Sequence, residues 1–386
     1  MMRDYPVVQQ VLGGLLFVLV LVDVWLTVLY ARIGTSIISY RVAVATWHAF
    51  RWGARPFGRH RSTVLTFCGP FVLVLLVFFW SMALAGGAAL MLQPALGSAV
   101  RAGTGATPTD FVTALFVGGS SLSVLSASGF EPHTSAYKLF FLLNSIVGTA
   151  VTSLTLMYLM QVYNALQRRN TLGLKLHLLA AENGDAAELL AGLGPQGQFS
   201  SGYTVLAEMA AEMTHVKESF HFYPVLFYFR FRKPHYSVSR ITLMCFDTVS
   251  LLKTTLSDEQ HGWLKESAPV AQLWRAAMLL VMTLTETYLP RHTPDPNYAP
   301  DAATAARWRA RYRAARQRLQ EAGIDTLHDE QTGADAYVRL RTLWFPYIEA
   351  LAPTMAFRPD EIDPVGQDPA SAGLRPAFAS RLRTGG

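Results

Sequence analysis

The chain has 386 residues, of which 51% are hydrophobic and only 16% are charged, and its mean hydropathy is +0.24. This composition is too apolar for an ordinary soluble domain and too polar for a fully embedded one, so it predicts a membrane domain joined to a cytosolic domain. The formal net charge of +6 does not require nucleic acid as a partner, because basic residues beside membrane spans produce the same balance.

The first element is an apolar run from Val7 to Ile33. A bilayer core takes about 20 helical residues, so this run is long enough to cross it. It has no small-residue cleavage site, which favours a retained transmembrane helix over a signal peptide. Asp23 lies inside the run. An intramembrane carboxylate is either a functional group or the ion-pair partner of a nearby base, here Arg32, and the pairing is the simpler interpretation.

The next segment is rich in arginine. Between Arg32 and Thr63 it carries six arginines and no acidic residue. Positive charge in a short loop marks the cytoplasmic side, so we expect this amphipathic segment inside, with its aromatic side chains among the lipid headgroups. A second apolar run, Val64 to Leu92, is then predicted to span outward, and it leads to an outer loop poor in basic residues.

The stretch from Asp110 to Arg169 organises the rest of the chain. It holds about a dozen apolar and small residues, a serine-rich polar turn, and then an apolar run of roughly thirty residues, of which only the last is long enough to span. Irregular backbone at membrane depth is tolerated only where protein or water surrounds it. The pattern therefore predicts a re-entrant pore helix from Asp110 to about Ser123, a loop, and a third span from Ser135 to Gln167.

The loop resembles the selectivity filter of the potassium-channel family. The family pattern T-T-x-G-Y-G-D-x-x-P aligns without gaps on Ser123, Val124, Leu125, Ser126, Ala127, Ser128, Gly129, Phe130, Glu131 and Pro132. The length of the pattern and its final proline agree with the family, whereas Ser126 and Ser128 occupy the positions of the two filter glycines. Two later segments, Tyr223 to Ser237 and Phe246 to Leu252, resemble the cytosolic part of bacterial membrane proteins that carry one such pore domain.

This resemblance implies a bacterial inner-membrane ion channel in which four copies of the chain close one conduction path for monovalent cations. Left-handed backbone costs a non-glycine residue about 1–2 kcal/mol, so Ser126 and Ser128 should prevent a full stack of carbonyl rings. We therefore expect potassium to pass with relaxed discrimination against sodium. Glu131 either forms an acidic ring at the outer mouth or bonds only to nearby backbone or to His133.

Two residues of the third span carry further expectations. Gly148 is either a gating hinge of the inner helix, as the resemblance implies, or a close-packing site between helices. Asn144, one turn earlier, is a candidate for the cavity wall. A different class of protein, a non-conducting membrane sensor or scaffold that kept the fold and lost the filter, remains the alternative to a channel.

The charges after the third span set the topology. Arg168, Arg169 and Lys175 require an inside end, so the N-terminus is expected outside and the C-terminal part in the cytoplasm. Residues 170–290 are predicted to form a cytosolic helical domain. The apolar run Ala268 to Leu289 is assigned to it as a buried helix, because a fourth span would move the tail outside.

The fold class predicted is therefore all-α, with three transmembrane helices, a re-entrant pore helix and a cytosolic helical domain. The expected domains are residues 1–63, 64–169 for the pore, 170–290 for the cytosolic part, 291–357 for a linker and a basic helical region, and 358–386 for a disordered tail. The arginine-rich helix within 291–357 either lies on anionic lipid or is solvated.

Other chemistry-bearing groups in the sequence have simple structural interpretations. Glu212, His215, Glu218 and His221 share a helix face, and pairing with Lys217 is favoured over a metal site. Arg230, Arg232, Lys233 and Arg240 bind an anionic ligand or lipid, or else hold carboxylates of their own domain. Cys68 and Cys245 fall in different compartments and should remain free. We expect no enzymatic activity, no cofactor and no nucleic-acid partner; membrane lipids are the expected surroundings.

Overall fold

The computed structural model describes residues 6–30, 36, 38–123, 129–289, 294–295 and 297–364. The described chain is mainly helical, with one two-stranded sheet, and it divides into two compact units. Unit 1 comprises Met1–Gly53, Phe67–Tyr163 and Phe222–Tyr228, and unit 2 comprises Ala54–Thr66, Asn164–His221 and Phe229–Gly386. The chain therefore passes between the two units several times, instead of completing one before it begins the other.

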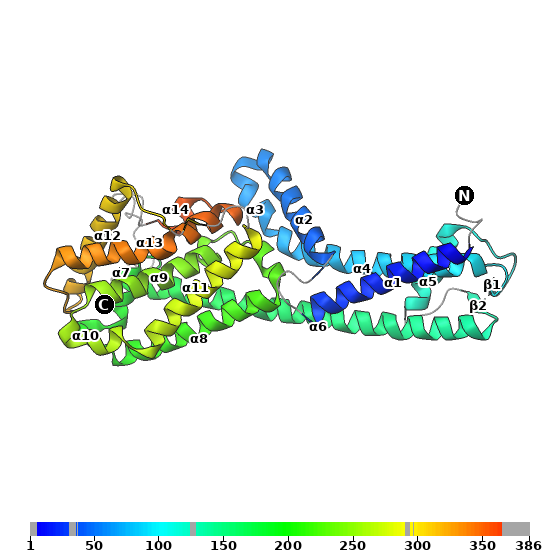
Figure 1. Cartoon of the computed structure of the whole chain (residues 1–386), viewed down its shortest axis with the longest axis horizontal. Helices are drawn as coiled ribbons and strands as arrows, with labels where there is room; N and C mark the ends of the chain where they lie inside the picture. The colour runs from blue at the N-terminus through cyan, green and yellow to red at the C-terminus, as the bar shows by residue number, and fades with distance from the viewer. Residues whose placement is uncertain are drawn as a thin grey trace, which may run out of the picture. The chain divides into compact units, whose positions relative to one another are not determined.

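Unit 1 is built mainly from apolar helices. Its elements are α1 (Pro6–Val28), α2 (Ser39–Gly53), α4 (Cys68–Leu92), η2 (Gln93–Ala95), β1 (Val100–Ala102), α5 (Phe111–Leu122), β2 (Phe130–Pro132), the first part of α6 (Ser135–Leu179) and η4 (Pro224–Tyr228), and Figure 1 labels the α-helices and strands among them. The two strands pair antiparallel, with Arg101 opposite Glu131.

Four helical segments in the described part of the chain are long and apolar enough to cross a membrane: Pro6–Val28, Arg61–Ala95, Ser135–Leu179 and Ala268–Tyr288. These apolar helices indicate a membrane-embedded protein. In the last of them, α11, half of the residues of the most apolar 18-residue stretch are buried. In each of the other three helices, 33% or less of the corresponding stretch is buried. It packs on α9 and α13 of unit 2, as expected for a helix of that unit's own core.

Polar side chains fix the directions of the unit 1 helices. Gln9 of α1 donates a hydrogen bond to Gln93, just beyond α4, at 2.6 Å, and Gln10 donates to the Tyr137 hydroxyl of α6 at 3.1 Å. The amide of Gln93 also reaches the Thr109 carbonyl, just before α5, at 3.5 Å. The start of α1, the end of α4 and the starts of α5 and α6 therefore lie together, so α1 and α6 run antiparallel to α4.

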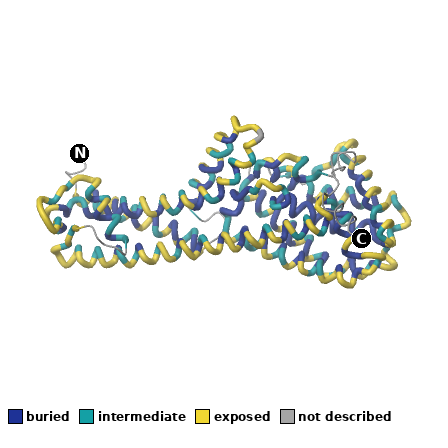
Figure 2. The backbone as a smooth tube through the Cα atoms, turned by 180° about the vertical axis from the view of Figure 1, so that it is seen from behind, coloured by how far each residue is buried: buried dark blue, intermediate teal, exposed yellow. Residues whose placement is uncertain are grey.

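Unit 2 is a helical assembly around α9. Its elements are η1 (Arg55–His60), α3 (Arg61–Thr66), the rest of α6, α7 (Ala186–Leu193), η3 (Pro195–Gly197), α8 (Ser200–Phe222), η5 (Pro234–Tyr236), α9 (Val238–Thr255), α10 (Asp258–Lys265), α11 (Ala268–Tyr288), α12 (Ala302–Glu321), α13 (Glu330–Thr354) and α14 (Pro359–Ile362). Every residue of α9 except Lys253 is buried, so Figure 2 draws this helix dark blue, whereas exposed residues run along α1 and α6.

Two C-terminal segments make contacts that the sequence did not predict. Residues 359–362, at the start of the segment 358–386 predicted to be a disordered tail, form α14, and the Asp363 side chain behind it is 13% exposed; residues 365–386 lie outside the described part. In the basic helix α12, Arg309 pairs with Asp335 and Arg318 with Glu188, while Arg307 and Arg313 are exposed. These partners lie far away in sequence.

Candidate functional site

The short helix α5 begins and ends where the sequence indicates. Asp110 is its N-cap: the carboxylate accepts hydrogen bonds from the Thr113 N–H at 2.9 Å and the Thr113 hydroxyl at 2.6 Å. Ser123 ends the helix, and its N–H donates to the Ser120 carbonyl. The helix predicted from Asp110 to about Ser123 is thereby confirmed. Its 12 residues extend about 18 Å, which is too short to cross a bilayer core of roughly 30 Å.

Glycines seat α5 against its neighbours. A Cβ on Gly118 of α5 would lie 2.8 Å from the Ala89 nitrogen and 3.1 Å from the Ala85 oxygen of α4. A Cβ on Gly148 of α6 would overlap the Leu122 carbonyl at the end of α5. The helix α6 runs unbroken through Gly148. The geometry therefore supports the close-packing interpretation of this glycine rather than a hinge.

The end of α5 lies well inside the apolar part of unit 1. Gly148, which contacts Leu122, is roughly 20 Å along α6 from Ser135, at a rise of about 1.5 Å per residue. The peptide carbonyls of α5 point toward this end, which gives it a partial negative charge.

Asn144 is not on an open face. It is buried, and its side-chain amide donates to the Ser121 hydroxyl of α5 at 2.9 Å, which in turn donates to the Gly118 carbonyl at 2.7 Å. The side chain thus joins α6 to α5, whereas the sequence suggested a cavity wall. Buried polar groups require such partners, and a neighbouring hydroxyl supplies one here.

The predicted filter is described only at its two ends. Val124, Leu125, Ser126, Ala127 and Ser128 lie outside the described residues. At one end Ser123 terminates α5; at the other Gly129 has a φ of +64°, a conformation that favours glycine, and Phe130 and Glu131 belong to β2. The Glu131 side chain is exposed, and no described residue donates a hydrogen bond to it. Its cross-strand neighbour is Arg101.

Asp23 has a structural role in unit 1. Its carboxylate accepts hydrogen bonds from the Ile38 N–H at 2.8 Å, the Ser39 hydroxyl at 2.5 Å and the Trp80 indole at 3.0 Å. It therefore caps the start of α2 and ties α1 to both α2 and α4. The expected partner, Arg32, lies outside the described residues.

The sequence analysis missed a face of α6. In the spanning half of this helix Thr149, Thr152 and Ser153 are exposed and Ser145 is half-buried. At 100° per residue these four lie together, next to the face that carries Asn144 and Gly148 and packs on α5. Apolar side chains such as Leu143 occupy the opposite side and are also exposed. In the sequence, the signal for this face was a set of hydroxyl side chains three or four residues apart within an apolar run.

The acidic and histidine cluster of α8 forms ordinary ion pairs. Glu218 pairs with Lys217 at 2.6 Å, and Glu212 pairs with Lys175 of α6 at 3.4 Å. Two of the basic residues near the start of α9 form hydrogen bonds with neutral oxygens, and carboxylates also lie near them, Glu361 near Arg230 and Asp363 near Arg240. Arg230 donates to the Ser62 hydroxyl at 2.6 Å, and Arg240 donates to the Ile362 carbonyl at 3.0 Å. Burial lowers the pKa of Arg240 to about 10.

A buried charge cluster holds the end of the described chain in unit 2. Asp247 of α9 is fully buried and lies 2.5 Å from Arg311 of α12 and 2.9 Å from Arg341 of α13. The same two arginines bind Asp363, Arg311 at 2.5 Å. Burial alone would raise the pKa of Asp363, but the guanidinium groups of Arg311 and Arg341 outweigh it and hold that pKa well below the usual range. Two cations and two anions thus balance.

Cys68 of unit 1 and Cys245 of unit 2 are both buried and free, as expected. Comparisons of the chain with family models, with curated proteins and with solved structures found no match. The fold by itself defines a mainly helical, membrane-embedded protein with a second, charge-stabilised helical unit.

Proposed function

We propose that the chain is one protomer of a homotetrameric channel for monovalent cations in the bacterial inner membrane. In this proposal α5 is the pore helix, α6 is the inner helix, and residues 123–131 form the filter. One observation carries the proposal: α5 is too short to span and ends against Gly148, at mid-depth of an apolar helical unit. A helix that stops there needs protein or water beyond its end.

Charge supports a cation as the conducted species. The C-terminal carbonyls of α5 are the negative end of its dipole, and four protomers would direct four such ends at one axis. The N-terminal end carries Asp110, which complements the positive end of the same dipole. Chloride would meet negative potential at the centre of the membrane.

The hydroxyl-bearing face of α6 supports a water-filled path. Ser145, Thr149, Thr152 and Ser153 lie beside the face of α6 that packs on α5, and the exposed Leu142 and Leu156 lie at the same angle one or two turns before and after them. In a tetramer this face can line the cavity below the filter while the opposite face meets lipid. The hydroxyls of Thr149 and Thr152 also donate to carbonyls one turn earlier on their own helix, which keeps them satisfied in either setting.

The filter is proposed to select loosely between potassium and sodium. Gly129 is the one filter residue at which the described backbone is left-handed, and serines stand at the two positions where the resembled family has glycine. Fewer ordered carbonyl rings leave a wider, wetter path. Glu131 adds negative charge at the mouth, although Arg101 on the neighbouring strand partly offsets it.

Ion flux into liposomes tests the proposal directly. Purified protein should pass potassium and sodium at rates within about tenfold of each other and exclude chloride, since each tenfold of discrimination takes about 1.4 kcal/mol. Absence of flux of any ion across a range of voltage, pH and lipid would leave the alternative, a non-conducting sensor or scaffold. A reversal potential equal to that of potassium would refute loose selection.

Cysteine substitution distinguishes the two exposed faces of α6. A charged thiol reagent should block flux through Thr149→Cys and leave Leu143→Cys unaffected, although both positions are exposed in the protomer. The native cysteines are buried and add little background. Block at both positions, or at neither, would contradict a cavity-lining role for the hydroxyl face.

Membrane topology is a separate element of the proposal. Cysteines introduced at Ala49 of α2 and Thr104 beyond β1, both exposed, should react from opposite sides of the membrane, the second from outside. Reaction of both from one side would overturn the arrangement with the N-terminus outside and unit 2 in the cytoplasm.

A further inference from the structure

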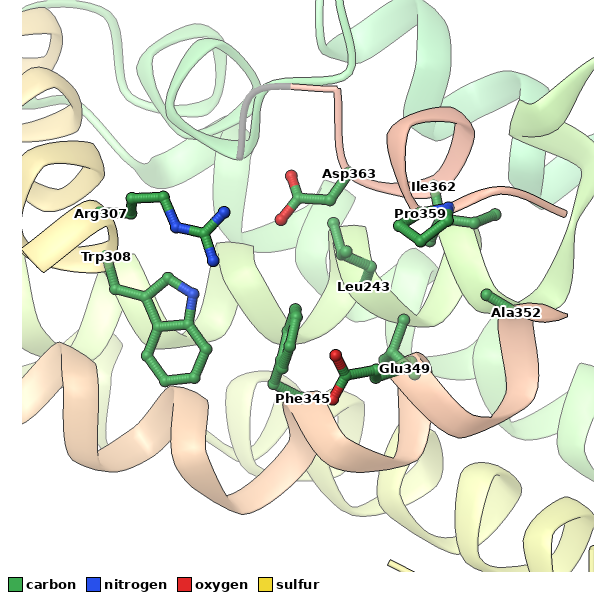
Figure 3. A pocket seen from close by; sticks show the side chains of 10 residues that line it. Leu243, Arg307, Trp308, Phe345, Glu349, Ala352, Pro359, Ile362 and Asp363 are labelled. Carbon is green, nitrogen blue, oxygen red and sulfur yellow. The ribbon is translucent and has the colours of Figure 1, made fainter. Parts of the chain in front are cut away.

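Unit 2 contains a cavity of about 180 Å³ between α12, α13 and α14 (Figure 3). Leu243 of α9 and Ile348 and Ala352 of α13 give it apolar walls. Trp308 and Phe345 also line it; their rings pack edge to face, with 5.1 Å between the ring centroids. Pockets for drug-sized ligands have roughly 300–1,000 Å³, so this cavity suits a smaller molecule.

Two charged side chains enter the cavity from opposite sides. Figure 3 shows the Arg307 guanidinium and the Glu349 carboxylate both directed toward its centre. Within the described part of the chain, neither forms an ion pair: Arg307 donates only to the Thr304 hydroxyl at 2.9 Å, and Glu349 accepts no hydrogen bond. Every other arginine of α12 is paired with a carboxylate. Both side chains are exposed to solvent as well as to the cavity, so this cation and anion are available to a ligand.

A buried donor points into the same space. Trp308 is only 4% exposed, and its indole nitrogen faces the centre of the cavity in Figure 3. No described residue accepts a hydrogen bond from it. The buried Trp344 and Tyr312 of the same unit, by contrast, donate to the Ser250 hydroxyl and the Thr254 carbonyl. The indole nitrogen opens to the cavity, where it can donate a hydrogen bond to a bound acceptor.

We propose that this cavity binds a small zwitterion of the amino-acid class with an apolar body. Its carboxylate accepts hydrogen bonds from Arg307 and from the Trp308 indole, its ammonium group pairs with Glu349, and its apolar part lies on Leu243 and Ile348. A simple anion would bind Arg307 and the indole but not Glu349, and a simple amine would bind Glu349 alone. A molecule with both charges contacts all three groups at once.

The fourth wall of the cavity connects it to the buried charge cluster. Pro359, Ile362 and Asp363 line that side. The carboxylate of Asp363 is already bound by Arg311 and Arg341, so it is not free for the ligand. A bound zwitterion therefore contacts α12, α13 and the α14 segment together, and it should stabilise unit 2 whether or not unit 1 conducts ions.

Calorimetric titration of the full chain in detergent tests this site. The probes are L-leucine, L-phenylalanine and 5-aminopentanoate, with 4-methylpentanoate and 3-methylbutylamine as analogues that carry one charge. At least one zwitterion should bind about tenfold more tightly than either analogue, the effect expected from one lost charged hydrogen bond. Equal binding of a singly charged analogue would overturn the zwitterion assignment.

Variants locate the binding. Arg307→Gln and Glu349→Gln should each weaken binding about tenfold or more, and Trp308→Phe, which keeps a ring but loses the donor, about fivefold. Arg339→Gln and Glu259→Gln remove exposed charges that do not line the cavity and serve as matched controls. Thermal unfolding without ligand checks that each variant is folded.

Three results would refute the site. They are no binding by any zwitterion, unchanged binding in both Arg307→Gln and Glu349→Gln, and equal losses in the two control variants. Because calorimetry measures no ion flux, each of these outcomes leaves the channel proposal untouched, and a failed flux experiment likewise leaves this binding site untouched.

Discussion

The contact between α5 and α6 in unit 1 and the contact of α9 with α13 in unit 2 hold helices together in opposite ways. In unit 1 glycine brings backbones together, as Gly148 does at Leu122 and Gly13 does at Gly87, and a neutral Asn144–Ser121 hydrogen bond joins two helices. In unit 2 large side chains fill the contact: the rings of Phe246 and Trp344 stack, with 5.3 Å between their centroids. Lipid offers helices no hydrophobic reason to associate, so close fit matters most there.

The two units also treat charge differently. Among the described residues, the Asp23 carboxylate of unit 1 accepts hydrogen bonds from the neutral donors Ile38, Ser39 and Trp80, whereas the Asp247 carboxylate of unit 2 is bound by two arginines and the Tyr337 hydroxyl. Removing a charge from water costs several kcal/mol unless a partner compensates. Unit 2 can bury such a cluster because Arg311 and Arg341 pair with both carboxylates and the Tyr337 hydroxyl also donates to Asp247.

The largest expected effect comes from breaking that cluster. Arg341→Met leaves two buried carboxylates with one arginine, which should destabilise unit 2 by about 3–5 kcal/mol. The measurement is chemical unfolding of the full chain followed by tryptophan fluorescence. Arg313→Gln, which removes an exposed ion pair with Glu330, is the control and should cost about 0.5 kcal/mol or less. Equal losses of unfolding free energy in Arg341→Met and Arg313→Gln would mean that the buried ion pairs stabilise unit 2 no more than the exposed one.

A smaller effect is expected where backbones meet in unit 1. Gly148→Ala places a methyl group against the Leu122 carbonyl, and since backbone cannot move aside easily, we expect a loss of about 1–3 kcal/mol. Thermal stability in detergent measures it. Gly86→Ala in α4, where nothing lies within 4 Å of the added carbon, should change stability little. A tolerated alanine at 148 would argue against close packing there.

Acid should weaken unit 2 at a histidine pair before it reaches the charge cluster. His235 stacks on His177 at 4.2 Å, and burial, then the nearby His177, Lys233 and Arg240, lowers the pKa of His235 to about 4. The unfolded chain, with a pKa near 6.5, binds the proton more readily. His235 therefore does not reduce the free energy of unfolding of unit 2 above about pH 6.5, and that free energy falls as the pH drops from 6.5 toward 4.

Unfolding measured across this pH range checks the assignment. His235→Gln should flatten the stability profile between pH 6.5 and 4. It should leave the loss at still lower pH, where the lowered pKa of Asp363 places the protonation of the charge cluster. An unchanged profile in the variant would show that another group titrates in this window.

The smallest effect is expected at Asp23. Asparagine also caps helices and keeps an acceptor for Ser39 and Trp80, so Asp23→Asn should change stability by about 1 kcal/mol or less and leave ion flux nearly intact. Liposome flux and thermal stability measure the two. A large loss of flux with normal stability would instead assign the carboxylate to conduction.

Local patterns in the sequence were enough to locate many elements but not their partners. The apolar runs located α1 and α4, and Asp110 with the short run after it located α5. Asp23 was paired in expectation with Arg32, the nearest base, yet its described partners include Trp80, which lies far along the chain. Local hydrophobic periodicity does not reveal long-range contacts of this kind.

The same limit explains the tail and the cavity. Residues after 358 have the composition of a disordered segment, and the ion pairs of Asp363 with Arg311 and Arg341, together with the hydrogen bond from Arg240 to the Ile362 carbonyl, attach this segment to the fold. Likewise Arg307 is one arginine among six in α12; its distinction is that it faces Glu349 and Trp308 across a space that no sequence pattern reveals.

The order of the charge cluster in the sequence sets an order for synthesis. The helices of unit 1, together with Asp247, Arg311 and Arg341, precede Asp363 in the chain. Until Asp363 follows, Asp247 alone faces the two arginines, and this cluster carries one more positive than negative charge. The cluster therefore reaches its final charge balance only after the apolar helices of unit 1 have been synthesised and are available to the membrane.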